Sequence, residues 1–74
     1  MGEMRFLSEE GDSKIMWDAD NEAEVEGAEA QFDLLIDKGY KAFKVKKDGE
    51  AGVEIKKFNP ALGKIILVPP IEGG

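Results

Sequence analysis

The chain has 74 residues, enough for one small domain, and carries 16 acidic against 10 basic side chains for a net charge of −6. It contains no cysteine and no histidine, which excludes disulfides, thiolate metal sites and the side chain that most often serves as general base. Since no base is present to activate a serine, we expect neither a catalytic residue nor a bound metal or cofactor.

The N-terminal residues predict a β-hairpin. Residues 4–7 are a short strand candidate, and residues 14–17 alternate, with Ile15 and Trp17 on one side. The six residues between them, 8–13, are polar or glycine, which predicts a turn of that length.

Residues 21–38 predict the one helix of the chain. Asn21 or Asp20 can cap its N-terminus, and Glu24 stands where a capping-box acid belongs. Gly39 suits the position that follows the last helical turn. These signals fix both ends of the predicted helix.

One face of this predicted helix is apolar. Its stripe falls at helical spacing and consists of Val25, Ala28, Phe32, Leu35 and Ile36. Gly27 weakens the middle of the helix by roughly 1 kcal/mol relative to alanine. The alternative is that Gly27 allows a close approach to a sheet.

Three strand candidates follow the helix. Phe43 and Val45 share one side of the first, and Val53 and Ile55 share one side of the second. The third, residues 64–68, is apolar on both sides, which is typical of the middle of a sheet. The sequence therefore predicts an α+β fold in which one helix packs on one sheet with a central C-terminal strand.

A single helix covers only one face of such a sheet. One pair of residues on the last strand, Ile65 with Leu67 or Ile66 with Val68, should therefore point toward the uncovered face. Two explanations of this apolar patch stay open. It docks another protein, or it is covered by the long side chains of Lys44, Lys46 and Arg5.

The order of these elements resembles the β-grasp fold of ubiquitin-like proteins. The last six residues are similar to the Pro-Pro-x-x-Gly-Gly tail of the molybdopterin-synthase small subunit, and read Pro69-Pro70-Ile71-Glu72-Gly73-Gly74. Thiamine sulfur carriers and processed ubiquitin also end in Gly-Gly. The resemblance implies a single β-grasp domain over residues 1–70 and a flexible tail over residues 71–74.

The resemblance also implies a function. In such carriers an adenylating enzyme uses ATP to activate the terminal carboxylate, which then becomes a thiocarboxylate, a thioester or an isopeptide bond. Gly74 would carry that carboxylate, and Gly73 would fit a narrow channel because it has no side chain. Pro69 and Pro70 would end the sheet and favour an extended tail. The protein would be a sulfur carrier or protein modifier, a substrate of the enzyme and not a catalyst.

The same resemblance identifies expected partners, namely the adenylating enzyme and a sulfur acceptor or target protein. The exposed side of the last strand would dock the enzyme, through Ile66 and Val68 if that pair faces outward. Phe43 and Val45 extend this docking surface if they share its face. We expect the carrier itself to be a monomer.

Two other functions stay open on the sequence. The first is a protein–protein interaction module that never uses its tail. The second is a nucleic-acid binder, in which Tyr40, Phe43 and Phe58 lie among lysines as a stacking sheet. A net charge of −6 and a single arginine argue against this second function. We therefore expect no nucleic-acid partner, and interpret the lysines as an edge that discourages strand pairing.

Charge and hydropathy also bear on location. No apolar run approaches the roughly 18 residues of a membrane-spanning helix, and no signal-peptide core follows Met1. We expect a cytoplasmic protein without a membrane partner.

The charge is unevenly distributed along the sequence. Residues 1–37 carry a net charge of −10, and residues 38–74 carry +4. This separation predicts either two solvated faces of opposite charge or a surface that steers a partner.

Overall fold

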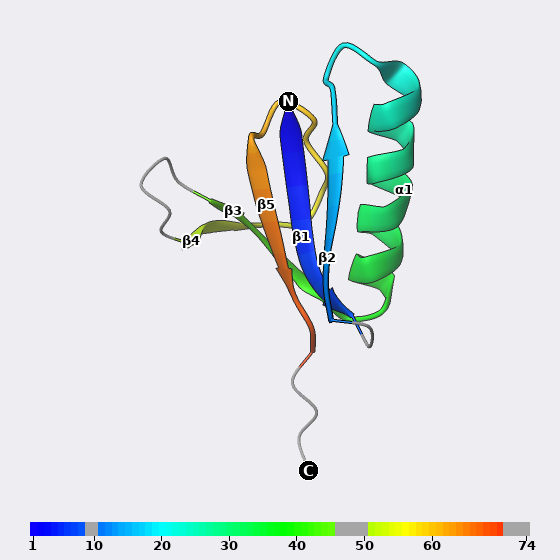
Figure 1. Ribbon diagram of the computed structural model, residues 1–74. Coiled ribbons are helices and arrows are strands. Elements are labelled where there is room, and N and C mark those ends of the chain that lie inside the picture. Colours follow the sequence, from blue (N-terminus) through cyan, green and yellow to red (C-terminus); the bar gives the residue numbers. More distant parts are fainter. Residues whose placement is uncertain (9–10, 46–50, 71–74) are drawn as a thin grey trace.

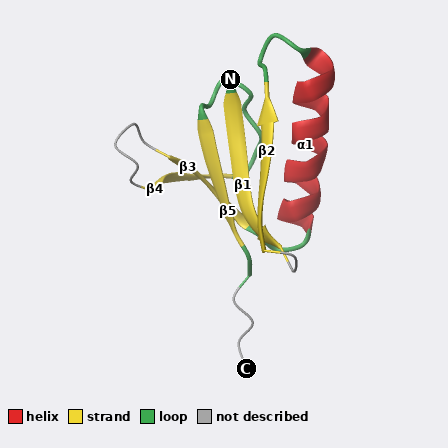
Figure 2. Ribbon diagram, viewed as in Figure 1, coloured by secondary structure: helices red, strands yellow, loops and turns green. Residues whose placement is uncertain are grey.

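The computed structural model describes residues 1–8, 11–45 and 51–70. It shows one helix and a five-stranded mixed sheet, which confirms the α+β prediction (Figures 1 and 2). In chain order the elements are β1 (Gly2–Ser8), β2 (Gly11–Trp17), α1 (Glu22–Asp37), β3 (Lys41–Val45), β4 (Ala51–Ile55) and β5 (Lys64–Val68).

The strands lie in the order β2-β1-β5-β3-β4. β5 is therefore the central strand, as its apolar sequence predicts. It runs parallel to β1 and antiparallel to β3, while the outer pairs β1–β2 and β3–β4 are antiparallel. Because β5 is the last strand, the chain leaves the sheet from its middle (Figure 1).

The N-terminal hairpin is longer than the sequence predicts. Ser8 pairs with Gly11, and the ladder continues without interruption to Gly2 and Trp17, so the predicted six-residue turn is wrong. Asp12 is polar and exposed, yet it belongs to the ladder. An edge strand keeps such a side chain in water, and its composition therefore resembles that of a turn.

The N-terminus of α1 is capped by side chains. The Oδ1 atom of Asn21 accepts hydrogen bonds from the backbone N–H groups of Ala23 and Glu24, at 3.1 and 3.2 Å. The Glu24 carboxylate accepts from the backbone N–H of Asp18 at 2.9 Å, rather than from that of Asn21. The N–H of Asn21 instead donates to the carbonyl of Asp18, which modifies the predicted capping box.

The C-terminus of α1 ends in a Schellman motif. Gly39 has a φ of +99°, a value that strongly favours glycine. The N–H of Tyr40 donates to the carbonyl of Leu35, and the N–H of Gly39 donates to that of Ile36, both at 3.0 Å. The predicted position of Gly39 is confirmed.

The core lies between α1 and one face of the sheet. Its buried members are Met4, Trp17, Ala28, Phe32, Leu35, Ala42, Phe58, Ile65 and Leu67. The Nε1 atom of Trp17 donates to the carbonyl of Pro60 at 3.0 Å. The Trp17 and Phe58 rings meet edge to face, with centroids 4.9 Å apart. Gly27 plays no part in this packing, since a Cβ atom added there would meet nothing within 4 Å.

Candidate functional site

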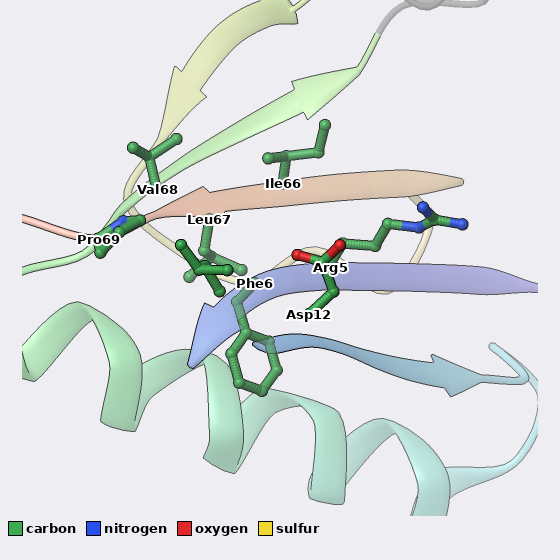
Figure 3. Close-up of a pocket in the computed structure, with 8 residues that line it drawn as sticks. Arg5, Phe6, Asp12, Ile66, Leu67, Val68 and Pro69 are labelled. Carbon is green, nitrogen blue, oxygen red and sulfur yellow. The ribbon is translucent and has the colours of Figure 1, made fainter. Parts of the chain in front are cut away.

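The two faces of β5 have different environments. Ile65 and Leu67 point into the core and are 0 % and 2 % exposed, whereas Ile66 is partly exposed and Val68 is 43 % exposed. Figure 3 shows Ile66 and Val68 on the side of β5 that faces away from Leu67 and the helix. Of the two pairs that the sequence left open, Ile66 and Val68 are the one that faces outward.

Phe43 and Val45 lie on the same side of the sheet as this pair. Phe43 is the partner of Ile66 in the β3–β5 ladder, and directly paired residues point to the same face. Val45 follows two residues later, so it shares that face. The partners of Phe43 and Val45 on β4 are Glu54 and Ala51, which places one extra residue on β4 and leaves the alternation of β3 intact.

We call the side of the sheet that faces away from α1 the open face. Its apolar patch contains Leu7, Phe43, Ile66 and Val68, and Val45 extends it along β3. Lys44 does not cover this patch, because it pairs with the buried Ile65 and therefore points to the other side. Lys46, the second lysine proposed as a cover, lies outside the described residues.

Arg5 is next to the patch, since it pairs with Ile66 across β1 and β5. Its Nε atom donates to a carboxylate oxygen of Glu3 at 3.1 Å, so the side chain is turned along its own strand and away from Val68 (Figure 3). This hydrogen bond holds the pKa of the Glu3 carboxyl below its usual value. The patch therefore has a polar margin but keeps its apolar surface accessible.

Two hollows flank the end of β5, and both are lined by Val68 and Pro69. The first has a volume of about 330 Å³ and lies toward β1, where Leu7 and Arg5 contribute to it (Figure 3). The second has a volume of about 370 Å³ and lies toward β3, where it is lined by Gly39, Lys41, Phe43 and Pro70. The first hollow thus combines apolar side chains with the basic Arg5 and the acidic Asp12, whereas the second combines them with the basic Lys41.

The residues that lead into the tail lie at the end of the sheet where α1 joins β3. Pro70 lies beside Gly39, where a Cβ atom on the glycine would approach the proline ring to 3.4 Å. At the same end of the sheet, the Tyr40 hydroxyl donates to the carbonyl of Leu7 at 2.6 Å. Pro69 lines both hollows together with Val68, so the two prolines leave the sheet at the margin of the apolar patch. Residues 71–74, including the expected Gly73 and Gly74, lie outside the described residues.

The aromatic residues proposed for nucleic-acid stacking are not brought together. Phe58 belongs to the core and is only 9 % exposed, so it does not join Phe43 on the stacking sheet that this disfavoured alternative requires. The sequence did not single out Leu7 or Lys41 for docking. Met4 and Phe6 share the core side of β1, so Leu7 points to the open face. The sequence could predict this only if the buried side of β1 were already known.

The described residues contain no group of three or more acidic side chains arranged to hold a metal ion. Within that same part of the chain, no helix is both long enough and apolar enough to cross a membrane.

No protein-family model, curated protein or solved structure matches the sequence or fold of this chain.

Proposed function

We propose that this chain is a ubiquitin-like β-grasp carrier or modifier, activated at its C-terminal Gly-Gly by an ATP-dependent adenylating enzyme. The central position of the last strand and the single helix on one face support the β-grasp assignment. The tail composition supports the carrier assignment, because two glycines can enter a channel that excludes side chains.

The observation that carries this proposal is that the apolar patch and the tail meet at one point. Val68 belongs to the patch, and only Pro69 and Pro70 separate it from the tail. An enzyme seated on the patch would therefore hold the start of the tail and direct its end into the active site. The terminal carboxylate then attacks the α-phosphorus of ATP and releases pyrophosphate. This carboxylate is that of Gly74. It is either the translated C-terminus or is produced by a processing protease.

The test is intact mass with C-terminal fragmentation of protein isolated from its native host. Wild type should carry a thiocarboxylate, an adenylate or a protein adduct on Gly74. A copy without Gly73 and Gly74 should carry none. Val68→Glu should lose most of the modification, because it places a charge in the patch. The matched control is Val53→Glu, at an exposed strand position outside the patch, which should be modified like wild type.

An unmodified Gly74 carboxylate under every growth condition, together with full function of the truncated copy, would contradict the carrier proposal. The second candidate is then an interaction module that uses the open face alone. The two hollows favour this candidate, because the described residues that line them form an apolar surface that a partner could contact whether or not the tail is used. In that case Val68→Glu still abolishes function, whereas removal of Gly73 and Gly74 does not.

A further inference from the structure

The outward side of α1 is a second surface that no described residue of the domain covers. Four uncharged residues recur there at intervals of four, three and four, on the side of the helix opposite the core, namely Ala23, Gly27, Ala30 and Leu34. All four are exposed, and Leu34 is 46 % exposed. We call them the outer stripe.

A row of acidic residues runs along one side of the outer stripe. It consists of Glu22, Glu26, Glu29, Asp33 and Asp37, all exposed. Within the described part of the chain, none of these carboxylates takes part in an ion pair. The helix therefore presents a smooth, nearly apolar stripe with a negative margin.

Gly27 makes no close contact that would require a glycine within one copy of the domain. It weakens the helix, and it faces open space, where an added Cβ atom would touch nothing. Small side chains at such positions do have a use when a helix lies close against another surface. Ala23, Gly27 and Ala30 together would allow the backbone of α1 to approach a flat sheet.

The open face has the complementary properties. No helix of the described residues covers its apolar patch. Its three inner strands carry Arg5, Lys41 and Lys64 on that side, against Glu3 alone. Glu3 is already paired with Arg5. The edge strands add the acidic Asp12, which lines the hollow toward β1, and Glu54, the partner of Phe43, together with the basic Lys14.

We propose that α1 of one copy packs through its outer stripe on the open face of a second copy. Leu34 then enters the hollow that Val68, Phe43 and Lys41 line, and the acidic row lies against the basic side chains of the inner strands. The contact is head-to-tail because its two surfaces differ, so each pair leaves one stripe and one open face free. This inference goes beyond the proposed function and does not depend on it, although both use the open face.

The experiment is sedimentation of the full chain at concentrations up to about 1 mM. A contact with a dissociation constant above about 1 mM would be too weak to be specific. The weight-average mass of wild type should rise with concentration. Ala30→Arg should stay monomeric, because it puts a long cation in the outer stripe, and Val68→Glu should stay monomeric because it puts an acid in the patch. Ala61→Arg is the matched control, an exposed alanine outside both surfaces, and should associate like wild type.

Mixing the two monomeric variants gives the decisive result. Val68→Glu keeps an intact outer stripe, and Ala30→Arg keeps an intact open face. An equimolar mixture should therefore form a dimer and nothing larger. A wild type that stays monomeric throughout, association that persists in Ala30→Arg, or a mixture that stays monomeric would each overturn the proposal. Persistence in Ala30→Arg with loss in Val68→Glu would identify a contact between two open faces instead.

Discussion

At the scale of single residues, a glycine at the start of β1 leaves the space that a large ring occupies. Gly2 pairs with Trp17 across the hairpin, and a Cβ atom added to Gly2 would overlap the indole ring. Trp17 cannot move aside, because it is fully buried and bonded to Pro60. We therefore expect Gly2→Ala to lower the free energy of unfolding by about 1–3 kcal/mol. Urea unfolding, followed by the fluorescence of the only tryptophan, measures this loss.

Gly63→Ala is the control for this change. Gly63 has no neighbour within 4 Å of an added Cβ atom and no positive φ, so its replacement should change stability by less than about 0.5 kcal/mol. Equal effects of the two substitutions would show that backbone freedom, and not the indole, sets the cost at Gly2.

The sequence predicted some of these residue environments and missed others. Alternation placed Ile15 and Trp17 on one side, which the structure confirms. Gly2 carries no comparable signal, because its place under a ring depends on the register of the hairpin. Phe58 lies among lysines and resembles an exposed aromatic residue, yet Trp17 and Phe32 enclose it from other parts of the chain.

At the scale of elements, the sequence predicted best the features that depend on hydrogen bonds between neighbouring residues. Asn21 and Gly39 define the ends of α1 through hydrogen bonds to neighbouring residues, and both were predicted. The hairpin turn was predicted too long, because polar residues suit an edge strand as well as a turn. The outward side of β5 was not predictable, because Ile65 and Ile66 differ only in what packs on them.

Gly27→Ala tests whether the domain itself needs a glycine in α1. An added methyl group would touch nothing, and alanine is the better helix former, so we expect unfolding to cost roughly 1 kcal/mol more. Asn21→Ala is the contrasting change on the same helix. It removes two capping hydrogen bonds and should lower the free energy of unfolding by about 1 kcal/mol. Thermal unfolding monitored by circular dichroism measures both. A less stable Gly27→Ala protein would mean that the glycine makes a contact within the monomer.

At the scale of the molecule, β5 connects the two halves of the sheet. Its pairing with β1 joins the two ends of the sequence, and its pairing with β3 joins the N-terminal hairpin to the C-terminal one. The sequence predicted the central place of β5 from its apolar composition. It did not predict which strands flank it, since no local pattern encodes a pairing over some sixty residues.

Neighbouring residues of β5 separate the stability of the domain from the use of its open face. Ile65 is fully buried among core residues, so Ile65→Ala should cost about 2–5 kcal/mol. A domain of this size has a total stability of only about 4–11 kcal/mol, so this single change removes much of it. Ile66 lies on the uncovered side, and we expect Ile66→Ala to cost about 1 kcal/mol or less while it weakens modification at Gly74. Urea unfolding gives the first quantity and intact mass the second. If both variants lost stability equally, the open face would be covered within the monomer, and docking would have to occur elsewhere.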